Sequence, residues 1–160
     1  MKTLKKIYLD TSVISAFFDL QKPVRQLMTE KWVINELVHY KPYISTLVLE
    51  EIEQTTDTNL KQKMLDLVDQ YQLNVLTITN EILNLAEEYR KQVIPKELND
   101  SIHIATASCN DISAIVSWNF KHIVNLQTIQ GIHAVNLQKK KPIIEILTVE
   151  NLGGAQYGNL

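Results

Sequence analysis

Short runs of β-forming residues alternate along this chain with longer segments of helical periodicity. Strands are predicted at residues 5–9, 42–45, 73–78, 112–118 and 143–147. Such alternation favours a parallel sheet, because two parallel strands need a long crossover connection and a helix supplies it. The sequence therefore predicts an α/β fold, a three-layer α/β/α sandwich around a central parallel sheet of four to five short strands.

Helices are predicted where apolar residues recur three and four positions apart. They cover residues 11–19, 24–39, 59–71, 82–93 and 99–110, with another helix starting at Leu47 and a short one from Asn125 to Gly131 or slightly beyond. Residues 73–78 are dense in Val, Leu, Ile and Thr, a composition typical of a strand buried on both faces. We therefore expect that strand to lie inside the sheet.

One compact domain accounts for the chain. Its 160 residues are 45% hydrophobic and 21% charged, which supplies a core and leaves little room for a second domain. We assign residues 1–150 to this domain and residues 151–160, which contain three of the four glycines, to a flexible C-terminal tail. The sequence shows no signal peptide, no membrane span and no partner for Cys109, so we expect a cytoplasmic protein.

Asp10 ends the first predicted strand. The carboxyl ends of the strands are where open parallel sheets bind their ligands, so a carboxylate at this place is positioned for chemistry. Thr11 and Ser12 follow it and can open a helix. The simpler alternative is that Asp10 only caps that helix.

Glu50 and Glu51 lie on the helix after the second strand. Leu47, Val48 and Ile52 define the apolar face of this helix. Glu50 points away from that face and is a solvated charge, whereas Glu51 lies on its border and can look into a cleft. An ordinary surface glutamate is the alternative for Glu51.

Asp100 lies in the first turn of a helix that is apolar nearly all round, as expected of a helix packed between layers. A carboxylate at the N-terminus of such a helix would then lie at the edge of the sheet, although a negative charge is also favourable at any helix N-terminus. His103 follows one turn later on the same side. It can steady a carboxylate or a phosphate, or make a structural hydrogen bond.

A fourth polar segment follows the strand at residues 112–118. Ser117 and Asn119 are two residues apart and share a face of the strand end, where they offer a hydroxyl and an amide carbonyl. The formal net charge of −2 gives no broadly basic surface, so any nucleic-acid contact would be local. Lys121 and His122 can meet a phosphate, as can the lysine run 139–141, whose first interpretation is a solvated turn.

Taken in order, these segments resemble the PIN-domain family of metal-dependent ribonucleases, especially the VapC-type toxins of type II toxin–antitoxin pairs. The matching stretches are Tyr8-Leu9-Asp10-Thr11-Ser12, Ile44-Ser45-Thr46-Leu47-Val48-Leu49-Glu50-Glu51-Ile52, Asn99-Asp100-Ser101-Ile102-His103-Ile104-Ala105-Thr106-Ala107 and Ile115-Val116-Ser117-Trp118-Asn119-Phe120-Lys121-His122. They span most of the chain. The resemblance implies hydrolysis of RNA phosphodiester bonds with Mg²⁺ or Mn²⁺, a homodimer, and a protein antitoxin that blocks the cleft.

The resemblance also assigns roles to residues. Asp10, Glu51 and Asp100 look like the acidic metal ligands, and Asn119 stands where many members have an aspartate. An amide oxygen can bind a hard cation but brings no charge, so a second metal ion would be held less firmly. The supporting or substrate-contacting residues are Thr11, Ser12, His103, Ser117, Lys121 and His122.

Two alternatives to a metal-dependent endoribonuclease remain open. Asn119 also fits a catalytically weak or inactive PIN-like module that binds RNA or a protein partner. A phospho-acceptor domain of receiver type also places an aspartate at a strand end. That class would have an acidic pair after the first strand, which Asp10-Thr11-Ser12 lacks.

Overall fold

A single parallel sheet of five strands forms the centre of the computed structural model, which describes residues 3–152. The strands are β1 (Lys5–Leu9), β2 (Tyr40–Ser45), β3 (Asn74–Leu76), β4 (Ala114–Val116) and β5 (Glu145–Leu147). Their order is β3-β2-β1-β4-β5, and all four neighbouring pairs are parallel. The predicted parallel sheet is thereby confirmed.

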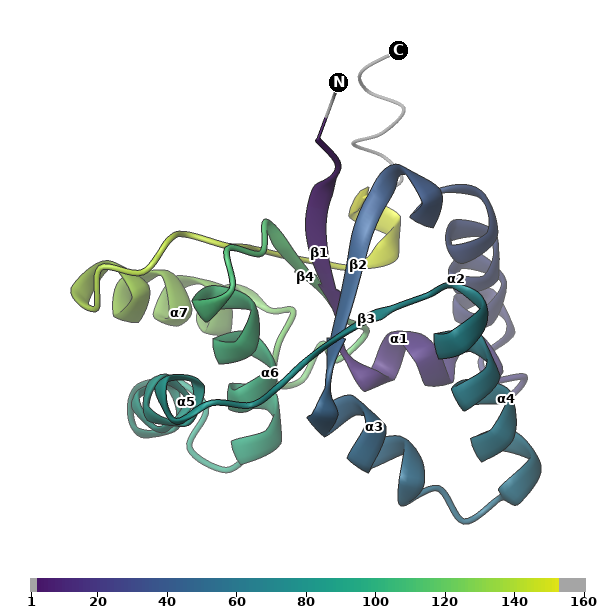
Figure 1. Cartoon of the computed structure of the whole chain (residues 1–160). Helices are drawn as coiled ribbons and strands as arrows, with labels where there is room; N and C mark the ends of the chain where they lie inside the picture. Colours follow the sequence, from purple (N-terminus) through teal and green to yellow (C-terminus); the bar gives the residue numbers. More distant parts are fainter. Residues whose placement is uncertain (1–2, 153–160) are drawn as a thin grey trace.

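Helices cover both faces of this sheet (Figure 1). The helices on one face are α1 (Thr11–Ala16), α2 (Pro23–Asn35), α3 (Thr46–Glu53) and α4 (Thr58–Gln70), and those on the other are α5 (Asn80–Gln92), α6 (Leu98–Cys109) and α7 (Leu126–Gln138). A 3₁₀ turn, η1 (Leu37–His39), leads into β2. The α/β/α sandwich predicted from the sequence is confirmed.

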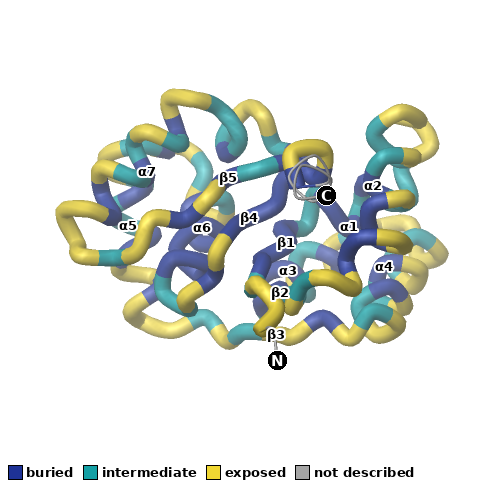
Figure 2. The backbone as a smooth tube through the Cα atoms, turned by 90° about the horizontal axis from the view of Figure 1, so that it is seen from above, coloured by how far each residue is buried: buried dark blue, intermediate teal, exposed yellow. Residues whose placement is uncertain are grey.

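The core follows the two central strands. Ile7, Tyr8 and Leu9 of β1 are buried, as is the whole of β4 (Figure 2). Runs of this kind are apolar on both faces because helices cover both sides of the sheet. Within residues 3–152, no helix combines the length and apolar character needed to cross a bilayer.

The chain reverses its direction of travel across the sheet at β1. It moves from β1 to β2 and β3 on one side, and later to β4 and β5 on the other. In open α/β sheets the crevice at such a switch point, outside the carboxyl ends of the strands, is where ligands bind. Asp10 follows β1 at this place, and Ser117 follows β4.

The strand predicted to be buried on both faces is an edge strand instead. β3 pairs with β2 alone, and its Asn74 and Val75 are exposed. Its composition predicted a strand correctly, but the prediction of full burial was wrong. Strand order depends on the crossovers between strands, which a local run of β-forming residues does not encode.

Two helices differ in length from their predictions. α1 ends at Ala16 instead of Asp19, because the backbone N–H groups of Phe18 and Asp19 turn to carbonyls three residues back. α7 continues to Gln138, well past Gly131. A Cβ atom on Gly131 would lie 2.7 Å from Val93 Cγ1. This glycine therefore serves a close approach between α7 and the end of α5, and does not stop the helix.

The described region ends in a helical turn at residues 149–152. Val149 and Leu152 are buried and belong to the core. Of the tail predicted at 151–160, Asn151 is exposed in this turn and Leu152 packs into the core, and residues 153–160 lie outside the described residues.

Candidate active site

Asp10 lies at the switch point with only 3% of its surface exposed. Its two carboxylate oxygens accept hydrogen bonds from Ser12 Oγ at 2.5 Å and Ser117 Oγ at 2.6 Å. Asp10 occupies the N-cap position of α1, but its side chain makes no capping hydrogen bond. Burial raises the pKa of Asp10, against the lowering effect of the charge of His103 and of the two hydroxyls. A simple capping role does not account for this carboxylate.

Glu51 enters the site from α3, while its neighbour Glu50 is exposed. Its Oε1 accepts hydrogen bonds from Thr11 Oγ1 at 2.8 Å and from His103 Nε2 at 2.6 Å. Burial acts to raise the pKa of Glu51, but the hydrogen bond and charge of His103, helped by Thr11 and Asn99, lower it below its ordinary value. Glu51 is therefore held ionised and in one orientation.

His103 is the centre of a buried hydrogen-bond chain. Its Nδ1 lies 2.7 Å from the Tyr8 hydroxyl, which lies 2.8 Å from Ser45 Oγ. Burial raises the pKa of Tyr8, so the phenol keeps its proton. With 2% of its surface exposed, His103 orients Glu51 through hydrogen bonds and has no surface left for a phosphate.

Asn119 presents its amide nitrogen, not its oxygen, to Asp100. Its Nδ2 lies 3.3 Å from Asp100 Oδ2, while its Oδ1 accepts a hydrogen bond from the backbone N–H of His122 at 2.9 Å. The reversed amide would set oxygen against carboxylate and NH₂ against N–H, so these two partners fix its orientation. Asn119 thus supports Asp100 and the turn that carries His122.

Asp100 is less enclosed than Asp10. Burial raises the pKa of Asp100 to about 6, and the negative charges of Asp10 and Glu97 add to this effect while His103 and His122 oppose it. The charge of Asp10 acts on Asp100 across the site, as does that of Glu51 on Asp10. The three predicted acidic residues therefore share one electrostatic environment at the carboxyl edge of the sheet.

Glu97, Asp100 and His122 form a closer group. One ligand atom of each lies within 4.8 Å of the others, and this is the one such set of three His, Cys, Asp or Glu residues in the described part of the chain. His122 Nε2 is 3.6 Å from Glu97 Oε1. Sequence reasoning missed Glu97, although its position three residues before Asp100 places the two on one side of the first turn of α6.

Trp118 joins α2 to the site. Its indole N–H donates to Thr29 Oγ1 at 2.9 Å, and its backbone N–H donates to Ser12 Oγ at 2.9 Å. The Arg25 guanidinium lies 5.0 Å from the centre of the Trp118 ring and 5.6 Å from that of Phe120. A cation over two aromatic faces stabilises the contact between α2 and the segment after β4.

The remaining predicted cations divide into two groups. Lys121 is exposed, and none of the described carboxylates lies within ion-pair distance of its amine. The lysine run 139–141 forms the turn after α7, where Lys140 has a φ of 55° and Lys141 pairs with Glu81. Lys121 is thus free to meet an anion, whereas Lys141 is already neutralised.

A family model for the PIN domain matches residues 7–121. This match covers more than half of the chain, which therefore belongs to the PIN-domain family. None of the curated proteins matches it.

The fold is also similar to that of several solved toxin and toxin–antitoxin structures. VapC20 of Mycobacterium tuberculosis, described as a sarcin-ricin loop cleaving toxin, superposes with a TM-score of 0.57 at 15% identity, over 72% of this chain and 92% of that one. VapBC2 of Rickettsia felis, solved with a DNA fragment from its promoter, has a TM-score of 0.54 at 16% identity, over 89% of this chain and 98% of that one. A toxin–antitoxin complex from Klebsiella pneumoniae has a TM-score of 0.55 at 17% identity, over 76% of this chain and 93% of that one. At these identities the likeness establishes the fold.

Proposed function

We propose that this protein is a cytoplasmic, metal-dependent endoribonuclease and the toxin of a type II toxin–antitoxin pair. The observation that carries the proposal is the gathering of Asp10, Glu51 and Asp100 at the switch point of the sheet. Membership of the PIN-domain family supports hydrolysis, and the likeness to a loop-cleaving toxin supports RNA as the substrate.

The donor set fits a divalent cation. Mg²⁺ takes oxygen ligands, which the three carboxylates supply, and an imidazole such as His122 also suits first-row transition metals. Burial raises the pKa of Asp10 and of Asp100, and the charges of Glu51 on Asp10 and of Asp10 on Asp100 act in the same direction, so ionising these carboxyls has a cost that a cation would relieve. A divalent ion held by these residues would supply Lewis-acid polarisation of the phosphoryl oxygen and a more acidic water as nucleophile.

The residues of this chain would divide the work between them. Ser12 and Ser117 hold the Asp10 carboxylate, and His103 holds Glu51 ionised, so both carboxylates keep their orientation before substrate arrives. We assign Asn119 a positioning role on Asp100, because its amide oxygen already accepts the His122 N–H. In place of an aspartate at position 119, Glu97 and His122 would complete the ligand set around Asp100.

Partners are proposed from the same fold. The likeness to toxin–antitoxin complexes supports a protein antitoxin that covers the site. Exposed apolar side chains at Val24, Leu27 and Ile34 of α2 offer a surface for an antitoxin or for a homodimer.

Incubation of the purified protein with structured and single-stranded RNAs tests the proposal. We expect cleavage that needs Mn²⁺ or Mg²⁺ and is lost in Asp10→Asn and Asp100→Asn. Cleavage that is unchanged in both variants would overturn it. RNA binding by the wild-type protein without cleavage in either metal would favour the inactive module that Asn119 also suits.

A further inference from the structure

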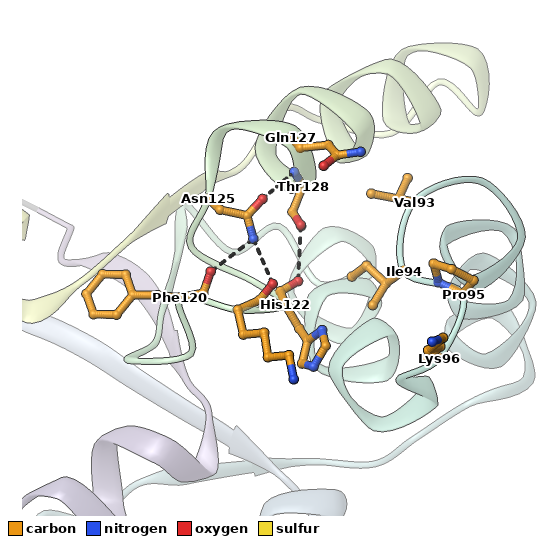
Figure 3. Close-up of a pocket in the computed structure, with 10 residues that line it drawn as sticks. Val93, Ile94, Pro95, Lys96, Phe120, His122, Asn125, Gln127 and Thr128 are labelled. Carbon is orange, nitrogen blue, oxygen red and sulfur yellow. Dashed lines mark hydrogen bonds between the residues drawn. The ribbon is translucent and has the colours of Figure 1, made fainter.

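A cavity of about 500 Å³ opens beside the acidic site. Its walls are residues 93–96, after α5, and side chains of the turn between β4 and the first residues of α7 (Figure 3). His122 belongs both to this wall and to the group with Glu97 and Asp100. A molecule bound in the cavity would therefore lie next to the proposed metal ligands.

One end of the cavity is cationic. Lys96, Lys121 and His122 line it, and Figure 3 shows Lys96 and His122 at the same end, away from Gln127. Lys96 and Lys121 are both exposed, and neither amine has a carboxylate within ion-pair distance among residues 3–152. Two unpaired amines at the edge of an acidic site, in a chain with a formal net charge of −2, suit an anion such as a phosphate.

The rest of the cavity combines an apolar wall with a free amide. Val93, Ile94 and Pro95 form one side, and Gln127 extends along the opposite side (Figure 3). The Gln127 side chain is exposed and makes no hydrogen bond to another described residue. An apolar wall and one amide with both donor and acceptor groups suit the face and the edge of a nucleobase.

The wall that carries these groups is held by local hydrogen bonds. Asn125 accepts from the Thr128 N–H at 2.8 Å and donates to the carbonyls of Phe120 and Lys121, each at 3.1 Å. Thr128 Oγ1 donates to the His122 carbonyl at 3.2 Å. These bonds tie the turn to the start of α7, so the cavity is formed before a ligand enters.

We propose that this cavity binds one nucleotide of the RNA next to the cleaved bond, with a phosphate at Lys96 and Lys121 and the base against the exposed ring of Pro95 and within reach of Gln127. The assignment to RNA rests on the proposed function. The cavity itself recognises a nucleoside phosphate, which an RNA strand or a free mononucleotide can supply.

Binding of a short fluorescein-labelled single-stranded RNA, followed by anisotropy in the Asp10→Asn background, tests this assignment without turnover. The test variant is Lys96→Gln/Lys121→Gln, and its charge-matched control is Lys5→Gln/Lys63→Gln, which removes two exposed lysines at the amino end of β1 and on α4. We expect the test pair to weaken binding at least about tenfold. The slope of log affinity against log salt concentration should become shallower by about 0.7, the contribution of one phosphate contact on a single strand. Gln127→Ala should change the preference among homopolymers and leave the salt dependence unaltered.

Equal affinity and equal salt dependence in the test and control pairs would overturn the proposal, whether or not the wild-type protein cleaves RNA. Conversely, absence of cleavage together with the expected loss of binding would refute the proposed nuclease and keep the binding site. Calorimetry with a 5′-mononucleotide separates the two sources of phosphate. A mononucleotide that binds as tightly as the strand would overturn the RNA assignment.

Discussion

On the β1 side of the site, Asp10 and Glu51 accept side-chain hydrogen bonds of 2.5–2.8 Å from serine, threonine and histidine. On the α6 side, Asp100 is held by one described side-chain hydrogen bond, at 3.3 Å from Asn119. The first side is fixed by a strand end and a buried hydrogen-bond chain. The second depends on the start of a helix and on a turn, and its members Glu97 and His122 are partly exposed.

This difference suggests a division of labour within one site. Carboxylates held by short hydrogen bonds are oriented before a ligand binds, which lowers the cost of reaching the reactive geometry. The α6 side has fewer restraints and sits beside the cationic cavity, where it can adjust to an incoming strand. Substitutions on the β1 side should therefore have the larger effect on activity and metal binding, and substitutions on the α6 side should adjust the affinity for metal and substrate by smaller amounts.

Loss of Asp10 should have the largest effect. We expect Asp10→Asn to lower the initial rate of RNA cleavage by about 10³-fold, since it removes a charged group from the centre of the site. Ser12 and Ser117 can each reverse a hydroxyl to accept from the new amide, so the fold should persist. In thermal melts the variant should lose the stabilisation that Mn²⁺ gives the wild-type protein. A full Mn²⁺ stabilisation in this variant would count against the site.

The hydrogen-bond chain through His103 should have the next largest effect. In His103→Gln the amide nitrogen can still donate to Glu51, whereas His103→Asn is too short to reach it. We expect the asparagine variant to lose about 10- to 100-fold in cleavage rate and the glutamine variant to retain most of it. Equal losses in the two variants, measured with both proteins folded by circular dichroism, would show that the role of His103 is only structural.

The α6 side predicts a spectroscopic signature. If His122 binds the cation, pulsed EPR of bound Mn²⁺ should show nitrogen coupling that disappears in His122→Ala and remains in His133→Ala. His122→Ala should also weaken Mn²⁺ binding roughly tenfold, a loss of about 1.4 kcal/mol in binding free energy. Nitrogen coupling that survives in His122→Ala would assign the ligand set to the carboxylates alone.

The pH dependence of stability should distinguish Asp100 from Glu51, and we expect this effect to be smaller. The pKa of Asp100 is raised to about 6, so the folded protein holds its proton where the unfolded chain, at its ordinary value of 3.8, has lost it. The metal-free protein should therefore lose stability as the pH rises from about 4 to about 6. Glu51 has the opposite sign, because its lowered pKa contributes stability that is lost on acidification.

Urea unfolding in EDTA at several pH values measures this effect. Asp100→Asn should show a smaller loss of stability between about pH 4 and about pH 6 than the wild-type protein. Asp10 is present in both proteins, so its own raised pKa cancels in the comparison. Identical pH profiles would mean that Asp100 is not desolvated in solution.

Much of this architecture can be predicted from local patterns. The alternation of strands and helices defines a parallel sheet, and the ends of parallel strands meet at one edge, so Asp10 and the segment after β4 come together. The position of β3 at the edge could not be predicted, because strand order is a property of the crossovers. Gly131 was misleading for a related reason, since its role depends on Val93 of another helix.

The site shows the same limit at the level of single side chains. The helical wheel separated Glu51 from Glu50 because burial follows periodicity. The orientation of Asn119 depends on the turn that brings the His122 N–H to its oxygen, and no spacing rule encodes that contact. Glu97 stood one turn before Asp100, but proximity to His122 is needed to single it out among surface glutamates.

The setting of Trp118 makes the site observable by light. Its indole is hydrogen-bonded to Thr29 and covered by Arg25, and its backbone is bonded to Ser12, which also holds Asp10. The second of the two tryptophans, Trp32, lies buried on α2, near Tyr40 of β2. With Trp32 replaced by phenylalanine, Trp118 becomes the sole tryptophan, and its fluorescence, excited selectively over that of the six tyrosines, would record the filling of the site in real time without any attached dye.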